Sequence, residues 1–278
     1  MATLTFTNAN WDTPQTVTVT GVDDSLADGT QTYDITIGVD AANSDNAFDL
    51  LADQTVSVDN ADDDVAGFTI VEEGGVTVTS ETGTTDTFTV VLDTQPLTDV
   101  VFEVSSGDPG EGTVDLATLT FTNANWDTPQ TVTVTGVDDS LADGTQTYDI
   151  TISVDAANSD DAFDLLADQT VSVDNTDDDT ASLIVVETDG NTITSEDATT
   201  DTFNVALGAQ PASDVVVNIV SSDLGEGTVN TGQLTFTNAN WDTPQTVTVT
   251  GVDDNLIDGN QPFTVTISVV DASSDDDF

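Results

Sequence analysis

One stretch of the chain, LTFTNANWDTPQTVTVTGVDD, occurs three times, starting at Leu4, Leu119 and Leu234 with a spacing of 115 residues in each case. Residues 1–65 and 116–180 differ at only five positions, which are Met1/Leu116, Gly38/Ser153, Asn46/Asp161, Ala61/Thr176 and Val65/Thr180. A period this long exceeds that of solenoid repeats and suits a domain with its own hydrophobic core. The sequence therefore predicts a tandem array of one domain type.

Acidic triplets recur in phase with this repeat and set its predicted boundaries. If each repeat begins after a triplet, residues 1–65 are the C-terminal half of a repeat, 66–180 form a complete one, and 181–278 form a repeat that lacks its last strand. Two organisations fit this phase. The chain is either a window on a longer array, which we favour, or a subunit whose half-domains are completed by neighbouring chains in a head-to-tail, strand-exchanged homopolymer.

The complete repeat alternates apolar and polar residues with the period of two that is typical of β-strands. Threonine fills most of the outward positions, where it favours strands and stays hydrated without charge. We expect strands at residues 68–72, 76–80, 87–92, 100–104, 118–121, 131–137, 148–154 and 170–174. The spacing predicts an all-β fold of tandem immunoglobulin-like β-sandwich domains, about seven strands each.

The charge of the chain excludes several kinds of partner and requires positive charge from outside the chain. The formal net charge is −53, and there is no Lys, Arg or His, although 37% of the residues are apolar and can form a core. Nucleic acid and anionic membranes bind basic side chains, so neither is an expected partner, and no apolar run is long enough to insert into a membrane. Without cysteine there is no disulfide. The self-repulsion therefore requires screening by salt or a bound divalent cation.

Acidic side chains gather at three places in each repeat, all at expected strand ends or turns. The first place is Glu81, matched by Glu196; the second is Asp138, Asp139 and Asp143, matched by Asp23, Asp24, Asp28 and by Asp253, Asp254, Asp258; the third is Asp177, Asp178 and Asp179, matched by Asp62, Asp63 and Asp64. Calcium accepts six to eight oxygens from separate loops, whereas zinc prefers His and Cys, which are missing. The sequence therefore predicts calcium (Ca2+) as the cation.

The run DDDVAGFTIVEEGGVTVTSETG, followed by FTVVLDTQPLTDVVFEV, LTF and QTVTVTGVDDSLADGTQTYDITI, resembles a Calx-beta domain. The resemblance covers residues 66–180 and most of both flanking pieces. It implies a calcium-binding β-sandwich with its ligands at one end, close to the next domain. The implied ligands are Glu81, Glu111, Asp138, Asp139, Asp143 and Asp177 to Asp179 in the complete repeat, and Glu196, Glu226, Asp253, Asp254 and Asp258 in the third. Glu111 stands where bacterial members usually have Asp.

The leading functional hypothesis is a structural segment of a secreted, extracellular, calcium-rigidified array, such as an adhesin stalk or a surface fibre. Its partners are then neighbouring repeats in the same or adjacent chains. One alternative is a self-assembling extracellular filament subunit completed by strand exchange. A second alternative is a glycan- or surface-binding module that uses Trp11, Trp126 and Trp241, although these side chains also suit a hydrophobic plug. With no His, Cys or Lys to act as base or nucleophile, we do not expect an enzyme.

Overall fold

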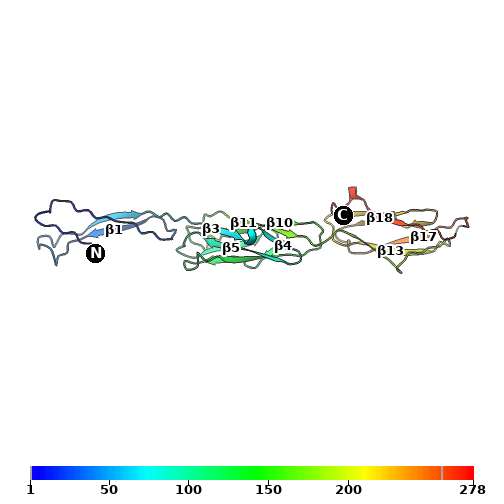
Figure 1. Cartoon of the computed structure of the whole chain (residues 1–278), viewed down its shortest axis with the longest axis horizontal. Helices are drawn as coiled ribbons and strands as arrows, with labels where there is room; N and C mark the ends of the chain where they lie inside the picture. Colours follow the sequence, from blue (N-terminus) through cyan, green and yellow to red (C-terminus); the bar gives the residue numbers. More distant parts are fainter. Residues whose placement is uncertain (1, 258) are drawn as a thin grey trace.

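The structure is a computed structural model that describes residues 2–257 and 259–278. Within these residues every regular element is a β-strand, apart from two short 3-10 helices, η1 (Glu73–Gly75) and η2 (Asp271–Ser273). Figure 1 shows three bodies that follow one another along the long axis of the molecule. No helix in the described part of the chain is long and apolar enough to cross a membrane. The expected all-β fold is confirmed.

The middle body is a β-sandwich of two sheets. The larger sheet has the order β4 (Thr77–Ser80), β11 (Gln169–Thr176), β10 (Gln146–Val154), β6 (Val100–Ser106) and β8 (Thr118–Phe121), and the smaller has the order β3 (Phe68–Glu72), β5 (Thr85–Leu92), β9 (Gln130–Gly136) and β7 (Gly112–Val114). All eight expected strand ranges are occupied by strands. The ninth strand, β7, is only three residues long, which is too short to show an alternating pattern.

The core of the middle body lies between its two sheets, where the inward residues of each strand meet. Phe88, Phe102, Phe121 and Phe163 are fully buried. Phe102 contacts Phe121 edge to face, with the ring centroids 6.0 Å apart. Each such aromatic side chain stabilises the fold by about 1.5–3 kcal/mol through burial. Because this core is apolar, it holds the sandwich together without any ion pair.

The third body repeats this arrangement with fewer strands. One sheet has the order β12 (Leu183–Glu187), β13 (Thr200–Leu207), β17 (Gln245–Gly251) and β15 (Gly227–Val229), and the other has the order β16 (Gln233–Phe236), β14 (Val215–Ser221) and β18 (Val265–Val269). Within the described residues, nothing in this body corresponds to the pair of strands β4 and β11. The outer edge of β18 therefore carries no strand partner in the described structure.

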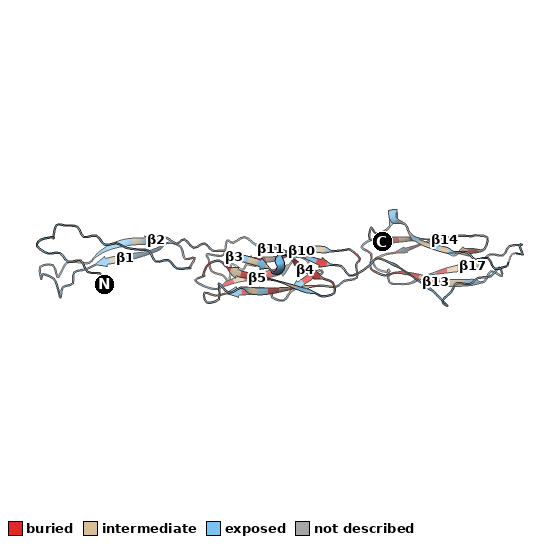
Figure 2. Ribbon diagram, in the orientation of Figure 1, coloured by how far each residue is buried: buried red, intermediate tan, exposed pale blue. Residues whose placement is uncertain are grey.

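The first body is a single two-stranded sheet, and its residues are exposed although nearly the same sequence is buried in the middle body. The sheet pairs β1 (Gln31–Ile37) with β2 (Gln54–Asn60). Phe6 is 54% exposed whereas its counterpart Phe121 is 0% exposed, and Phe48 is exposed whereas Phe163 is fully buried. Figure 2 shows the contrast, with buried residues concentrated in the second and third bodies. The difference follows from the missing second sheet, because no strands cover the inward face of β1 and β2.

Candidate metal centre

The topology of the middle sandwich carries its acidic loops to one end. Strands β4 and β11 run parallel, with Ser80 opposite Thr176. Glu81, which follows β4, and the triplet that follows β11 therefore leave the sheet at the same end. Strand β9 also ends there, because Gly136 pairs with Gly112 at the start of β7. Loops that are distant in sequence therefore meet at this end, which is the end nearest the third body (Figure 1).

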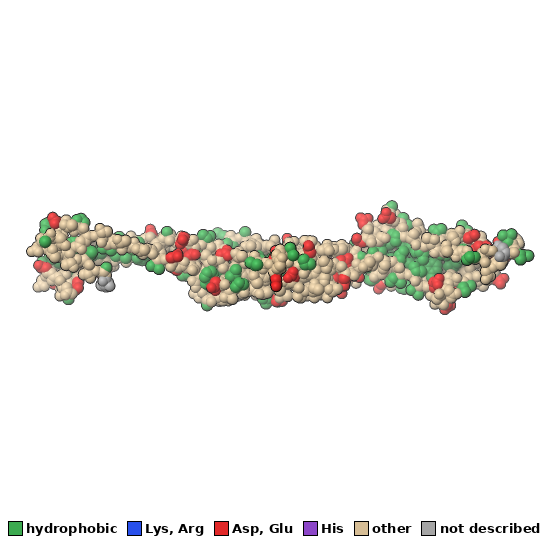
Figure 3. All heavy atoms as spheres, viewed as in Figure 1, with side chains coloured by type: hydrophobic (Ala, Val, Ile, Leu, Met, Phe, Trp, Pro, Cys, Tyr) green, Lys and Arg blue, Asp and Glu red, His purple; other side chains and the backbone are tan. Residues whose placement is uncertain are grey.

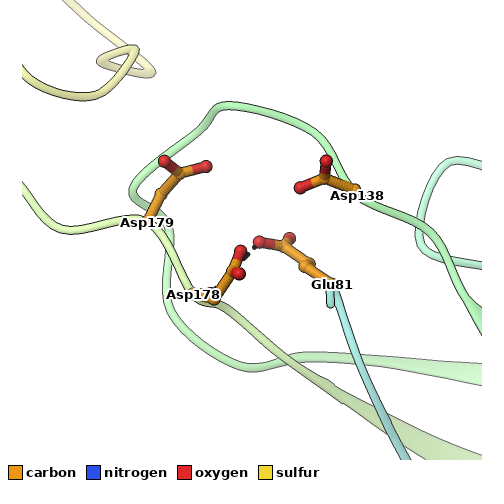
Figure 4. A group of neighbouring side chains, drawn as sticks. All are labelled: Glu81, Asp138, Asp178 and Asp179. Carbon is orange, nitrogen blue, oxygen red and sulfur yellow. Dashed lines mark hydrogen bonds between the residues drawn. The ribbon is translucent and has the colours of Figure 1, made fainter. Parts of the chain in front are cut away.

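Four carboxylates from three of these loops converge on one point. Glu81, Asp138, Asp178 and Asp179 each offer an oxygen that lies within 4.8 Å of the others. In Figure 4, Glu81 and Asp178 face each other, and the carboxylates of Asp179 and Asp138 lie above them, one on each side. Two oxygens on opposite sides of one calcium ion would lie about 5 Å apart, because each bond is about 2.3–2.6 Å long. The spacing of the four oxygens therefore matches a shared calcium ion.

Glu81 is the buried member of this group. Its side chain is 2% exposed, and its Oε2 accepts a hydrogen bond of 3.3 Å from the backbone N–H of Asp178. The pKa of Glu81 is raised from 4.5 to about 7, chiefly by burial and in smaller part by the charges of Asp177 and Asp139, against the lowering effect of that hydrogen bond. A buried carboxylate among like charges is costly, so this position favours either a proton or a cation.

A second group lies beside the first and shares Glu81. Glu111 and Asp139 offer oxygens within 4.8 Å of Glu81 and of each other. Burial raises the pKa of Glu111, although the side-chain amide of Asn175 donates to it at 3.2 Å and opposes the shift. Asp143 also lies at this end, where burial raises its pKa and its Oδ1 is buried without a hydrogen-bond partner. An unpartnered buried oxygen beside two acidic groups suits a cation ligand.

The first aspartate of the triplet plays a different part from the other two. Asp177 accepts from the backbone N–H of Gly144 at 2.8 Å and from the N–H of Asp179 at 2.7 Å. Both of its oxygens therefore hold the loops in place, whereas Asp178 and Asp179 face the other acids. Burial and the charge of Asp177 raise the pKa of Asp179. The structure separates a loop-fixing residue from two candidate ligands within one DDD run.

The first body brings the matching residues together in the same way. Asp23, Asp63 and Asp64 offer oxygens within 4.8 Å of one another, at the positions that correspond to Asp138, Asp178 and Asp179. Asp62 accepts from the N–H groups of Gly29 and Asp64, as Asp177 does in the middle body, and these bonds lower its pKa. Asp24 and Asp28 lie in the same acidic hollow but do not belong to the three-residue group.

The third body does not form such a group within the described residues. Glu196, Glu226, Asp253 and Asp254 are described, and Asp254 accepts from the backbone N–H of Leu256 at 2.7 Å, which shapes its turn. Asp258 lies outside the described residues. Among the described residues of this body, Glu196 and Asp253 are not brought within ligand distance of a third acid, and the acids at 275–277 match residues 160–162 of the middle body rather than its closing triplet. The sequence prediction of ligands there stays a prediction.

Sequence reasoning missed Asn175, which connects the loops of the site. This fully buried amide accepts from Thr79 Oγ1 at 2.9 Å and donates to Glu111 Oε2 and to the carbonyl oxygen of Val137, both at 3.2 Å. It also packs against Gly136, where an added Cβ would lie 2.5 Å from its Oδ1. The sequence VDN recurs just before each of the two triplets, and this recurrence could have drawn attention to Asn175. The sequence does not show, however, which distant groups hydrogen-bond to an amide on a strand.

The tryptophans of the NANWD loops lie at the opposite end of each repeat. Trp126 and Trp241 are half-buried and pack against the cores of the middle and third bodies, as expected of a hydrophobic plug. The backbone carbonyl of Trp126 also accepts from the N–H of Leu92 at 3.2 Å. Trp11 is exposed, because its body lacks the second sheet.

The chemistry of the donor set fits calcium. All the converging atoms are carboxylate oxygens from separate loops, an environment that calcium accepts and that magnesium, with its strict octahedral geometry, accepts less readily. The buried Glu81 and the orphaned Asp143 Oδ1 identify the inner positions of the site. Figure 3 shows acidic side chains on the visible face and no basic ones, so no group of this chain can neutralise the cluster.

A comparison with protein-family models finds no match, and a comparison with curated proteins finds none either. Among solved structures, the chain is similar to the calcium binding domain CBD12 of CALX1.1, with 16% identity and a TM-score of 0.29 over 72% of this chain and 80% of that one. It is also similar to domains 4 and 5 of the S-layer protein SbsC, with 21% identity and a TM-score of 0.26 over 45% of this chain and 52% of that one. A structure of SbsC domains 4–9 matches with 19% identity and a TM-score of 0.27, over 79% of this chain and 33% of that one. At these sequence identities and TM-scores, the similarities carry no argument about the site, which rests on the residues of this chain.

Proposed function

We propose that this chain is a segment of an extracellular, cell-surface repeat array in which calcium at each seam stiffens the connection between successive sandwiches. The observation that carries this proposal is the convergence of Glu81, Asp138, Asp178 and Asp179 at the end of one sandwich, a few residues before the next one begins at Leu183. We take residues 1–65, 66–180 and 181–278 as parts of three such repeats. The resemblance of their sequences to Calx-beta domains supports the same function.

The chain's own residues explain why a cation matters at the seam. The linker between the sandwiches is the DDD run itself, and burial together with neighbouring charge raises the pKa of Asp179 and Glu81. Bound calcium supplies positive charge and oxygen coordination at this point. Asp178 and Asp179 are then held against Glu81 and Asp138, so the linker direction is fixed by four anchors. With the site empty, these like charges repel, and the linker is free to bend.

The proposal is tested by thermal unfolding in chelator and in excess calcium at constant ionic strength. Binding to the folded state alone adds RT ln(1 + [Ca]/Kd), which is about 2.7 kcal/mol at a hundredfold excess over Kd. Asp138→Asn should remove most of this gain. Asp161→Asn is the matched control, because it removes one charge from an exposed position where the first copy carries Asn46. A calcium-induced shift that is absent in the parent protein, or equal in all three proteins, contradicts the proposal.

Stiffening is tested separately by small-angle scattering. In calcium the maximum dimension should match an extended row of bodies such as Figure 1 shows, and in chelator the distribution of distances should broaden toward shorter values. Because salt also screens the acids, the two samples must share one ionic strength well above that of the added calcium. Identical scattering profiles with confirmed calcium binding would show that the ion stabilises the domains without stiffening the array.

A second candidate function, a filament subunit completed by strand exchange, is favoured by one observation. The sequence QTVSVDN occurs as β2 and again as residues 169–175 of β11, where it pairs with β10. Strand β18 corresponds to β10, and its outer edge has no strand partner in the described structure. A β2 strand from another copy therefore fits that edge in sequence and register. Electron microscopy decides: fibres of the purified chain support this candidate, and monodisperse particles contradict it.

A further inference from the structure

Successive bodies touch through a loop-to-turn contact whose hydrogen bonds come from backbone groups only. Between the middle and third bodies, the N–H of Gln210 donates to the carbonyl oxygen of Ser140 at 2.7 Å, and the N–H of Ala142 donates to the carbonyl oxygen of Gln210 at 3.1 Å. Leu141 and Gln210 thereby form an isolated parallel β-bridge. The loop side of this contact is the SLAD segment, residues 140–143, which follows the candidate ligand Asp139 and ends at the candidate ligand Asp143.

The same contact forms between the first and middle bodies. The N–H of Gln95 donates to the carbonyl oxygen of Ser25 at 2.7 Å, and the N–H of Ala27 donates to the carbonyl oxygen of Gln95 at 3.2 Å. Leu26 and Gln95 form the corresponding bridge. The loop sequence is SLAD in both cases, but the receiving turn is TQPL in one and AQPA in the other. The same contact forms although the residues on either side of the Gln–Pro pair differ. We infer that the Gln–Pro pair and the backbone define the receiving turn.

Each receiving turn is held rigid by its own repeat. The side-chain amide of Gln95 donates to the carbonyl oxygen of Asn123 at 2.7 Å, and that of Gln210 donates to the carbonyl oxygen of Asn238 at 3.1 Å. Both acceptors belong to the NANWD loop. The proline that follows each glutamine is buried and has a fixed φ. The turn therefore presents its N–H and C=O groups in a preset orientation, which lowers the entropic cost of docking.

A small residue takes part in each of these contacts. Ala142 is 5% exposed, and Ala27 belongs to the buried apolar cluster of the middle body rather than to its own. The third copy carries Ile257 at this position, where the side chain is fully exposed. An isoleucine at position 142 would add three side-chain carbons beside the hollow that Ala142 lines together with Gly144, Asp179 and Asp277, so the two bodies could approach each other less closely. The size of the residue at this position is therefore a variable part of an otherwise repeated contact.

We propose that residues 140–142 and the Gln210–Pro211 turn form a docking contact through which one repeat recognises the next and sets its orientation, with alanine at position 142 as the specificity determinant. The partner is the Gln–Pro turn of a following sandwich. No carboxylate oxygen takes part in the hydrogen bonds between the bodies, although within the loop Asp139 Oδ1 accepts from the N–H of Leu141 at 2.6 Å; the inference therefore goes beyond the proposed calcium function. Residues 25–27 and Gln95 form a second instance within the same chain.

Disulfide trapping tests the contact directly, because the chain contains no cysteine. Bridge partners on neighbouring strands lie about 4.8 Å apart, which is within the range that a disulfide spans. The pair Leu141→Cys/Gln210→Cys should form an intramolecular disulfide under mild oxidation. The mismatched pair Leu141→Cys/Gln95→Cys is the control, because Gln95 faces the first body at the opposite end of the sandwich. We expect the matched pair to react at least about tenfold faster, reflecting its higher effective concentration.

Both pairs are measured at high dilution in chelator and in calcium, with gel mobility separating intramolecular from intermolecular products. A faster matched pair in both conditions supports the contact. Equal rates overturn it, and trapping confined to calcium overturns the claim that peptide groups suffice. If the protein shows no calcium-induced thermal shift but the matched pair still reacts faster, only the proposed function fails. The two ideas are therefore distinguishable.

The specificity of the alanine is tested on the matched-pair background. Ala142→Ile, which copies the third repeat, should slow trapping toward the rate of the mismatched pair, whereas Ala142→Ser should leave the rate unchanged. With Trp11 and Trp241 replaced by phenylalanine, the fluorescence of Trp126 checks that each variant retains its folded middle sandwich. If Ala142→Ile folds and is trapped as fast as the parent, the residue does not determine the fit. If Ala142→Ile does not fold, Ala142→Val, which adds a smaller branched side chain and leaves both cysteines in place, provides the same test.

Discussion

Glu81→Gln is expected to stabilise the metal-free protein and to weaken its response to calcium. The folded-state pKa of Glu81 is about 7, against an ordinary value of 4.5. A carboxyl whose pKa is raised by folding contributes stability that is fully present below pH 4.5 and is lost as the pH rises through 7. The difference of about 2.5 pKa units corresponds to about 3 kcal/mol. Glutamine has nearly the same shape as glutamate and stays neutral at every pH. The variant should therefore keep, at high pH, the stability that the parent loses when Glu81 ionises.

The assay follows thermal and denaturant unfolding of the middle sandwich, with Trp11 and Trp241 replaced by phenylalanine so that Trp126 reports alone. In chelator at pH 8, Glu81→Gln should unfold on the order of 10 °C above the parent, and the gap should close as the pH falls to about 4.5. In calcium the order should reverse, because the variant loses an inner ligand. Asp161→Asn should follow the parent throughout, since its carboxylate is exposed.

Two results would refute this reasoning. If Glu81→Gln destabilises the metal-free protein at pH 8, the ionised carboxylate of Glu81 does not destabilise the fold. If the variant keeps the full calcium-induced shift, Glu81 is not a ligand even though its oxygen lies within 4.8 Å of three other acids. Either result can occur without the other, so the electrostatic and the ligand roles are judged separately.

Three further predictions concern the supports of the site and the charge of the chain. Asn175→Ala should cost about 1–3 kcal/mol in denaturant unfolding, because it leaves buried partners on Thr79 and Glu111 unsatisfied; an unchanged midpoint would refute its supporting role. Gly136→Ala should cost at least about 1–3 kcal/mol in the same assay, because an added Cβ would lie 2.2 Å from the carbonyl oxygen of Ser80; unchanged stability would show that the loops give way easily. Sodium chloride should raise the melting temperature in chelator as the Debye length falls from about 8 Å to about 3 Å at 1 M; a salt-independent melting temperature would show that self-repulsion of the acids does not limit stability.

The strand pattern of the middle sandwich could be predicted from sequence because alternation with a period of two reports which face of a strand is buried. Strand β9 illustrates this, since Val132 and Val134 are fully buried between threonines that point outward. The short β7 could not be found in this way. It exists because Gly112 and Val114 pair with the end of β9, and three residues carry too little periodicity to show it.

The acidic end of the sandwich could be predicted only in part. The phase of the repeat identified Glu81 and Asp178 as members of recurring clusters, and the structure brings their oxygens together. The separate role of Asp177, which fixes the loops through two backbone N–H groups, follows from chain geometry that a run of three identical residues does not reveal. The connecting role of Asn175 depends on partners up to 96 residues away. The assignment of these residues as calcium ligands stays a prediction.

By itself, the sequence determined the repeat, the β-strand periodicity and the need for external positive charge, because each of these is a local or summed property of the residues. Only the tertiary structure decided which copy of a repeated segment forms its strands and buries its apolar residues. Residues 118–121 and 130–136 form β8 and β9, whereas the same residues in the first copy, 3–6 and 15–21, form no strand. The physical reason is that a strand is stabilised by partners, and β5, β6 and β7, which pair with β8 and β9, come from residues 85–114.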